Sequence, residues 1–342
     1  MVMSICKKLR KCEKNSSVMS KKSDSLGKAI SGGGLIEVVL LGTYILTITG
    51  FFGKFGWILD LTSNFRVQYA VIQLLCLLFL LLIKRWKSVV VALLFATINM
   101  TQIVPWYIND SRLTDAGTTV VGKVKILLIN VSTSNTDHDK TMEYIKRMNP
   151  DLLALEEIND RWLSDLSPVL ASFSSKEVLT REDNFGIGLF GKIPFQNSKV
   201  EYFGKARVPS IISKICIAER PVTILFTHPL PPGSVDYFHL RNEQLEEIAS
   251  SRKDFGDSLI VMGDLNTTSW SYYYKRFVSR MKLHDSRKGF GIHASWPAML
   301  PIMLIPIDHC LISGDIIVLD RKVGHNLGSD HYPVYIELEL LD

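Results

Sequence analysis

The residues of clearest chemical interest follow a run of β-forming residues near position 260. Residues Ser258–Met262 predict a strand buried on both faces, and Gly263 ends it. In an extended chain, Asp264 and Asn266 then point the same way. A carboxylate accepts a proton from water while a carboxamide holds that water or a phosphate oxygen, as hydrolysis of a phosphate ester requires. An isolated Gly-Asp-Leu-Asn sequence is also typical of an ordinary turn, so residues elsewhere must decide.

Polar residues at the ends of other predicted strands favour the chemical interpretation. They are Asn130, the pair Glu156 and Glu157, His228, Asp308, Asp330 and His331. Each alone has a structural explanation, such as a turn, a helix cap or a hydrogen-bonded core histidine. Together, carboxylates, a carboxamide and imidazoles at strand ends are groups that bind a hard divalent cation and a phosphate. The sequence therefore predicts a metal-dependent phosphoesterase site.

The segments that must position these residues begin near residue 121. Strands are predicted at residues 124–130, 151–155, 186–190, 214–218, 222–226, 259–262, 307–312, 316–320 and 333–340, and helices at 137–148, 240–251 and 271–281. Because strands are frequent and helices few, we predict an α/β sandwich of two sheets flanked by helices. His309 should point to the opposite face of its strand from Asp308, which predicts a structural role for it.

Three apolar runs precede this region. They are Leu35–Phe52, Val67–Ile83 and Ser88–Tyr107. A helix needs about 17 to 25 apolar residues to cross the hydrocarbon of a bilayer, so each run suffices. Buried core helices are the alternative, but the weak amphipathic periodicity of the runs favours three transmembrane helices.

Basic residues indicate how these spans are oriented. Eight lysines and arginines precede the first run, two follow it (Lys54 and Arg66), and three follow the second run. The positive-inside rule places the N-terminus in the cytoplasm and everything after the third span on the other side. We therefore predict a multi-pass protein of the inner (cytoplasmic) membrane with a periplasmic or otherwise extracytoplasmic catalytic domain. The predicted divisions are a basic cytoplasmic tail (1–32), three transmembrane helices (33–108), a linker (109–120) and the catalytic domain (121–342).

The distribution of charge bears on possible partners. The chain has 39 basic and 34 acidic residues, but 13 basic and only 4 acidic residues lie before residue 110. The predicted catalytic domain is therefore slightly acidic, which gives no support for a broadly cationic nucleic-acid surface. The five cysteines lack metal-type spacing, and we expect Cys216 and Cys310 to be buried free thiols, with pairing as the alternative in an oxidising compartment.

In their order along the chain, these motifs resemble the endonuclease/exonuclease/phosphatase superfamily. They are Asn130, Leu155-Glu156-Glu157, Gly263-Asp264-Leu265-Asn266, Ile307-Asp308-His309 and Ser329-Asp330-His331. Stretches at residues 130–135, 227–232, 241–245 and 295–297 further resemble its bacterial branch anchored by N-terminal membrane helices. The resemblance implies a DNase I-like four-layer α/β sandwich over residues 121–342.

The resemblance also implies a metal site. Glu157 should bind Mg²⁺, with Mn²⁺ as a possible substitute, while Asn130 and Asp330 support the metal or its waters. Glu156 is a departure, because the family often has glutamine at this position. The additional negative charge is expected to alter the affinity for the metal.

Catalytic roles follow from the same resemblance. Asp264 should orient and deprotonate the attacking water, and Asn266 should hold that water or the scissile phosphate. His331, polarised by Asp308, should contact the phosphoryl oxygens, and His228 should stabilise or protonate the leaving oxygen.

The sequence leaves the substrate open between nucleic acid and a phospholipid or lipid-linked phosphate. The apolar stretch Trp296–Leu304 suits contact with a bilayer, although a buried loop is the simpler interpretation. Arg241 is either a phosphate clamp or an exposed arginine on a helix face. A membrane sensor or assembly module that keeps the fold without catalysis is the alternative to an enzyme. No protein partner is inferred.

Overall fold

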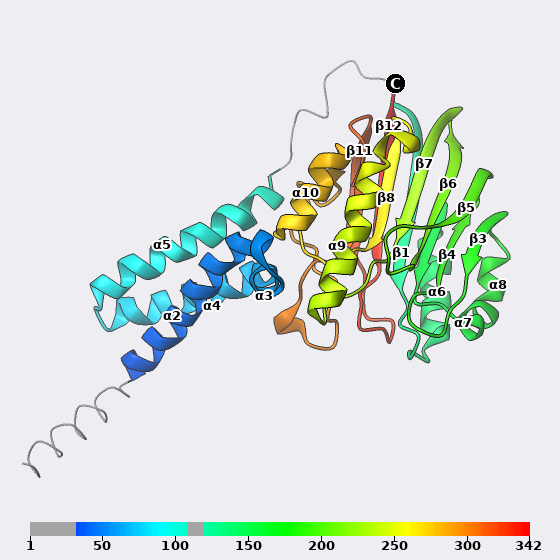
Figure 1. Cartoon of the computed structure of the whole chain (residues 1–342). Helices are drawn as coiled ribbons and strands as arrows, with labels where there is room; N and C mark the ends of the chain where they lie inside the picture. Colours follow the sequence, from blue (N-terminus) through cyan, green and yellow to red (C-terminus); the bar gives the residue numbers. More distant parts are fainter. Residues whose placement is uncertain (1–31, 109–119) are drawn as a thin grey trace, which may run out of the picture. The chain divides into compact units, whose positions relative to one another are not determined.

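The computed structural model of the chain describes residues 32–108 and 120–342 (Figure 1). Apart from one residue each, the predicted tail and linker lie outside these ranges. The described residues form two compact units. The first contains the residues up to Ile48 together with Tyr69–Met100, and the second contains Thr49–Gln68 together with the described residues from Thr101 to Asp342.

The first unit consists of three apolar helices. They are α2 (Gly32–Thr49), α4 (Arg66–Leu82) and α5 (Trp86–Ile103). With the short helical turns beside them, the stretches Gly34–Phe55, Trp57–Leu82 and Trp86–Trp106 are long and apolar enough to cross a membrane. The predicted number and position of candidate spans are therefore confirmed.

A buried polar network lies among these helices. Asn99 on α5 donates from Nδ2 to Thr47 Oγ1 on α2 (2.9 Å) and to Gln73 Oε1 on α4 (3.0 Å). Gln73 Nε2 in turn lies 3.2 Å from Thr43 Oγ1. Polar side chains that meet within apolar helices satisfy one another and fix how the helices align.

Residues 50–65 join the helices α2 and α4, and we call them the span-connecting segment. The segment forms η1 (Gly50–Phe55), α3 (Trp57–Leu61) and η2 (Thr62–Phe65), and it belongs to the second unit. The sequence analysis predicted no helical structure between the spans, because these elements are one turn or little more in length.

Two six-stranded sheets form the centre of the second unit. The first has the order β11 (Ile316–Val323), β12 (Val334–Leu341), β1 (Val120–Asn130), β2 (Leu152–Glu156), β4 (Ile187–Gly191), β3 (Ser175–Leu179). The second has the order β5 (Phe195–Tyr202), β6 (Pro209–Ile217), β7 (Arg220–Thr227), β8 (Leu259–Asp264), β10 (Asp308–Ile312), β9 (His284–Asp285). Each sheet has one parallel pair at its centre, β1 with β2 and β7 with β8, and the other pairs are antiparallel.

Helices cover the outer faces of both sheets (Figure 1). The helices α6 (His138–Met148), α7 (Asp160–Asp165) and α8 (Ser167–Leu170) pack on the first sheet, and α9 (Val235–Ser250) and α10 (Tyr272–Met281) pack on the second. Shorter 3-10 turns lie at Val104–Trp106, Arg252–Phe255 and Pro301–Met303. Apolar residues of both sheets, such as Ile126 and Met262, meet between them in one buried core. This arrangement confirms the predicted four-layer α/β sandwich.

The structure adds strands that the sequence pattern did not predict. β3 and β5 lie at sheet edges, where alternating exposed and half-buried residues give a weak apolar signal. The predicted helix stop at Asn149-Pro150 is confirmed, since α6 ends at Met148 and the capping residue Asn149 is in the left-handed conformation. Cys76, Cys216 and Cys310 are free thiols, and Cys310 is buried as expected, whereas Cys216 is only half-buried.

Candidate active site

The strand pairing brings the chemically interesting residues to one end of the two sheets. In the first sheet, Asn130 at the end of β1 pairs with Glu156 at the end of β2. In the second sheet, Asp264 at the end of β8 pairs with Asp308 at the start of β10. β7 ends beside β8, and its next residue is His228. Parallel strands end at the same edge of a sheet, which is why residues so far apart in the sequence meet.

Gly263 allows the two central strands of the second sheet to approach closely. Its φ is 142°, and a Cβ at this position would lie 2.1 Å from Thr227 O and 2.8 Å from Glu156 Oε1. The prediction that the strand stops at this glycine is wrong, because β8 continues through Asp264. Glycine is required at this position because a side chain would collide with the neighbouring backbone, and because its torsion angle φ is one that other residues rarely adopt.

Asp264 lies between two histidines. Its Oδ2 is 3.6 Å from His228 Nε2 and 3.6 Å from His331 Nε2, and His331 Nδ1 lies 2.9 Å from Asp308 Oδ2. All four side chains are buried. The structure thus brings together four of the five residues assigned to catalysis in one Asp-His-Asp-His arrangement.

Asn266, the fifth, is placed by a turn. Its backbone is left-handed with φ 50°, its N–H donates to Asp264 Oδ1 (2.8 Å), and its Nδ2 donates to Pro229 O (2.9 Å). The chain after Asp264 is therefore not extended, contrary to the geometric expectation. The turn and the polar site are compatible, since the turn orients the carboxylate of Asp264.

The three residues assigned to the metal lie beside this arrangement. Asn130 Nδ2 donates to Glu157 Oε1 (2.9 Å), and Asp330 Oδ2 accepts from Trp296 Nε1 (2.9 Å). Glu157 has a left-handed backbone (φ 61°), which turns its side chain out of line with β2. Among the described residues, no three His, Cys, Asp or Glu side chains are arranged as a preformed metal cluster.

Glu156 also lies in the site, although the sequence analysis assigned it neither a catalytic nor a metal-binding role and expected only that its charge would alter the affinity for the metal. Its Oε1 accepts from the backbone N–H of Asp264 (2.8 Å), and its Oε2 is buried without a hydrogen-bond partner in the described structure. Burial, followed by the nearby charges of Asp264 and Asp308, raises the pKa of Glu156 well above its usual range. The sequence feature that could have assigned a role to Glu156 is its place in a pair of adjacent carboxylates at the end of a strand.

Burial and like charges shift the pKa values of the other acids. Burial raises the pKa of Asp264 well above its usual range, with His331 opposing and Asp308 reinforcing this effect. Burial likewise raises the pKa of Glu157. Asp308 differs, because the His331 ring overcomes the effect of burial and lowers the pKa of Asp308.

The two histidines of the site differ in protonation state. Burial opposes the charge of His331, but the carboxylate of Asp308 outweighs it, and the pKa of His331 rises to about 10. Burial and the His331 charge lower the pKa of His228 to about 3. His228 Nδ1 is buried without a partner in the described residues, and its ring lies 5.4 Å from the ring of Phe185. His331 is thus a cation and His228 a neutral ring near pH 7.

This donor set fits a divalent cation. Glu156, Glu157 and Asp264 are carboxylates that burial and mutual repulsion push toward protonation, and a nearby cation would remove that penalty. The available donors are carboxylate and amide oxygens, which Mg²⁺ and Mn²⁺ prefer. The buried Oε2 of Glu156, which has no hydrogen-bond partner in the described structure, is consistent with the same conclusion.

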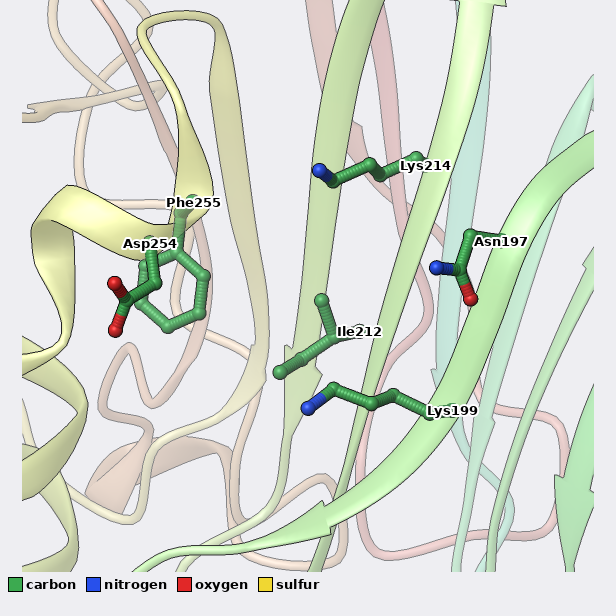
Figure 2. A pocket seen from close by; sticks show the side chains of 6 residues that line it. All are labelled: Asn197, Lys199, Ile212, Lys214, Asp254 and Phe255. Atoms are coloured by element: carbon green, nitrogen blue, oxygen red, sulfur yellow. The ribbon is translucent and has the colours of Figure 1, made fainter.

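A separate hollow lies on the second sheet (Figure 2). It has a volume of about 180 Å³ and is lined by Asn197 and Lys199 on β5, Ile212 and Lys214 on β6, and Asp254 and Phe255 beyond α9. None of the predicted site residues lines it. The candidate site at the strand ends is therefore separate from this hollow.

Two expectations need correction. Arg241 is neither exposed nor aimed at a phosphate, because its side chain is buried and pairs with Asp60. The stretch Trp296–Leu304, which we call the apolar loop, is not a buried loop. Met299 is 75% exposed and Ile302 is 76% exposed, since the loop projects from the surface where its backbone groups remain solvated.

Comparison with known proteins identifies the family. Residues 127–331 match the Endonuclease/Exonuclease/phosphatase family, which is more than half of the chain. The chain belongs to this family. A comparison with curated proteins gives no match. As a member of the endonuclease/exonuclease/phosphatase family, the protein is a hydrolase of phosphate esters.

Solved structures share the fold of this family member. D. rerio TDP2 complexed with a single strand DNA product is 15% identical and has a TM-score of 0.54 over 63% of this chain and 98% of that chain. The human Nocturnin catalytic domain with bound sulfate anion is 17% identical, with a TM-score of 0.54 over 66% and 97% of the two chains. A family protein from Bacteroides vulgatus is 16% identical, with a TM-score of 0.53 over 64% and 99%. At these identities the similarity establishes the fold alone.

Proposed function

We propose that the protein is a membrane-anchored, Mg²⁺-dependent phosphoesterase that acts on the outer side of the cytoplasmic membrane. The observation that carries the proposal is the Asp308–His331–Asp264–His228 arrangement beside Glu157 and the other buried acids. Its groups match the requirements of phosphoryl hydrolysis, which are a base for water, positive charge at the phosphoryl oxygens and a donor at the leaving oxygen.

The metal would be held by oxygen donors. Glu157, with Asn130 and Asp330, would hold Mg²⁺, and Mn²⁺ suits the same donors. When bound, the ion supplies positive charge that offsets the charge developing on the phosphoryl oxygens. Asn130 orients the Glu157 carboxylate through its hydrogen bond of 2.9 Å.

The remaining residues move protons and hold charge. The oxygen of water attacks phosphorus, the phosphorus–oxygen bond to the leaving group breaks, and Asp264 takes the proton that water loses. Asn266 orients Asp264 through its backbone N–H. Cationic His331 contacts the phosphoryl oxygens. Because its pKa is lowered to about 3, His228 stabilises the leaving oxygen by hydrogen bonding, and that oxygen takes its proton from solvent.

Contacts of the span-connecting segment support the outer location. Trp57 Nε1 donates to Pro232 O (2.7 Å), and Thr268 Oγ1 donates to Asn64 Oδ1 (2.8 Å). The segment therefore lies on the same side of the membrane as the catalytic region. The opposite loop has three basic residues within positions 84–87, whereas the span-connecting segment has only Lys54. The positive-inside rule then places the catalytic region outside the cytoplasm.

A lipid-borne phosphate is the substrate class that we propose. The apolar loop exposes Met299, Leu300 and Ile302. One end of the loop accepts a hydrogen bond from Gln68 at the start of α4 (2.8 Å), and the other end contacts the site through Trp296. Exposed apolar side chains between a candidate span and the site suit contact with acyl chains. Nucleic acid is the second candidate, because TDP2 was solved with a DNA product, but the region is slightly acidic.

Hydrolysis of a chromogenic diester tests the reaction. The full chain, purified in detergent, is expected to cleave bis(p-nitrophenyl) phosphate with Mg²⁺ and to lose this activity with EDTA. Asp264→Asn and His331→Ala should each lower kcat by about 100-fold or more. The exposed controls Asp257→Asn and His325→Ala should leave kcat unchanged. Absence of Mg²⁺-dependent hydrolysis by the unsubstituted chain would instead favour a non-catalytic sensor or assembly module, and full activity of both site variants would refute the assignment of the reaction to this site.

Competing substrates test the lipid assignment. The full chain should hydrolyse phosphatidic acid or phosphatidylglycerol in mixed micelles faster than it nicks DNA. Replacing Met299, Leu300 and Ile302 by serine should raise KM for the micellar lipid about tenfold, because the lost apolar area no longer contributes to binding. The same variant should cleave the soluble diester normally, and Leu319→Ser, another exposed leucine, serves as the control. Faster cleavage of DNA would reverse the assignment.

A further inference from the structure

A buried ion pair links the span-connecting segment to the catalytic region. Asp60 on α3 places Oδ2 3.2 Å from Arg241 Nη2 on α9. Asp60 is 2% exposed and Arg241 is 1% exposed, so solvent does not screen the pair. The second oxygen of Asp60 accepts from Ser271 Oγ (2.7 Å). The carboxylate is therefore held on both sides by residues of the catalytic region.

Arg241 extends this link to the site. Its Nη1 donates to the backbone carbonyl of Asn266 (2.8 Å), while Asn242 Oδ1 accepts from its Nε (3.0 Å) and Nη2 (2.8 Å). Asn266 has a left-handed backbone and donates its N–H to Asp264. The arginine thus holds the carbonyl of the same residue whose N–H orients the proposed base.

A second contact reaches the same loop. We call residues 264–268 the catalytic loop. Thr268, at its end, is fully buried and donates to Asn64 Oδ1 (2.8 Å), and Asn64 belongs to η2 of the span-connecting segment. The catalytic loop is therefore held near its middle through Arg241 and at its end through Asn64.

The negative charge of Asp60 stabilises the buried positive charge of Arg241. Burial lowers the pKa of Arg241, and the Asp60 carboxylate opposes that shift. A buried arginine that loses its acid must recruit water or move, because an unpaired charge is costly in the interior. The packing around Asp60 is close, since a Cβ on Gly53 would lie 2.7 Å from its Oδ1. Movement of Arg241 would release the carbonyl of Asn266.

We propose that Asp60 and Asn64 are positioning residues of the active site. The span-connecting segment holds the catalytic loop, Asp60 through Arg241 and Asn64 through Thr268. The phosphoesterase site is consequently complete only when the span-connecting segment is packed against the catalytic loop and α9. The effect of these two residues on catalysis rests on the proposed function. Their effect on the position of the catalytic loop does not depend on it.

A pair of variants separates positioning from stability. In the full chain in detergent, Asp60→Ala should lower Tm by about 10 °C, since it leaves a buried charge unpaired. It should also lower kcat about 100-fold with little change in KM, because a displaced base fails in the chemical step. Adding Arg241→Met removes the unpaired charge. The double variant should regain most of the lost Tm but none of the lost kcat.

Asp60→Asn provides a test if the alanine variant does not fold. Asparagine retains the shape and an oxygen for Ser271 but not the charge, so kcat should fall less than for alanine. Ile58→Ala, an exposed position on the same helix, is the matched control and should behave as the unsubstituted chain. Joint recovery of Tm and kcat in the double variant would show a structural role only and overturn the inference.

Hydrogen exchange gives a readout that does not depend on activity. In the double variant, amides of residues 264–268 should exchange at least several-fold faster, while amides of β1 and β12 keep their rates. Asn64→Ala should produce the same local change near Thr268. Unchanged exchange in this loop would overturn the inference even if the protein were an active phosphoesterase. Absence of activity in the unsubstituted chain, with the predicted exchange, would refute the proposed function alone.

Discussion

Replacement of Asp308 by asparagine should make the positive charge of His331 depend on pH near neutrality. Asp308 Oδ2 lies 2.9 Å from His331 Nδ1, and the pKa of His331 is raised to about 10 from an ordinary 6.5. This difference corresponds to about 5 kcal/mol in favour of the charged ring, at about 1.4 kcal/mol for each factor of ten. Burial lowers the pKa of this ring, and without the carboxylate of Asp308 only Asp264 and Asp330 oppose that effect, so the pKa of His331 should fall in Asp308→Asn.

The loss of this charge should appear in both rate and pH profile. For Asp308→Asn we expect kcat/KM for bis(p-nitrophenyl) phosphate at pH 7.5 to fall by about 100- to 1000-fold. The residual rate should rise as the pH is lowered from 8 to 6, whereas the unsubstituted enzyme should show no loss of His331 charge in this range. Asparagine preserves the shape of the side chain, and the Asp257→Asn control reports on the effect of a lost surface carboxylate.

Stability gives an independent measurement of the same interaction. The raised pKa of His331 contributes stability that is complete below pH 6.5 and is lost as the pH rises through about 10. The free energy of unfolding of the unsubstituted chain should therefore fall over this window, and that of Asp308→Asn should fall much less. Equal pH profiles for rate and stability in the two proteins would refute the assignment of the His331 charge to Asp308.

Three further outcomes are expected. Saturating Mg²⁺ should raise Tm, and Glu157→Gln should abolish most of that increase, because the ion binds the folded site only. Gly263→Ala should lower the free energy of unfolding by about 3 kcal/mol or more, measured in urea, since its Cβ would lie 2.1 Å from Thr227 O. Glu156→Gln should still accept from the Asp264 N–H and keep activity within a few-fold. Because the pKa of Glu156 is raised in the folded chain, this variant should be more stable than the unsubstituted chain at pH 8 and equally stable at pH 4.

The sequence predicted the parts of the fold that depend on strong local patterns. Residues 126–129 of the central strand β1 and residues 259–262 of β8 are continuous apolar runs, and the candidate spans are longer ones, so both are visible without tertiary information. Edge strands β3 and β5 were not predicted, because partners across the sheet stabilise them more than their own side chains do. The pairing that brings Asn130 beside Glu156 depends on topology, which local patterns do not specify.

The sequence predicted which residues form the candidate site better than it predicted the contacts that these residues make. Asp264, Asp308 and His331 were identified by residue type and strand position, and the structure places His331 within 4 Å of both aspartates. The environment of Arg241 was not predictable, because its partner Asp60 lies 181 positions earlier in the chain. The boundary drawn at residue 121 likewise excluded Thr49–Gln68, which share the compact unit of the catalytic region. Only the folded chain reveals such distant pairs.

The polar network among α2, α4 and α5 has a consequence for biogenesis. Gln73 has partners on both α2 and α5, and Asn99 bonds to both of the other helices. A nascent chain that has inserted only two helices holds the Gln73 amide in hydrocarbon with its partner Asn99 still to be synthesised. Insertion of the third helix supplies the missing hydrogen-bond partner, so the three helices should adopt their final alignment together at that step. Chains truncated before Asn99 should accordingly be substrates for membrane quality-control proteases.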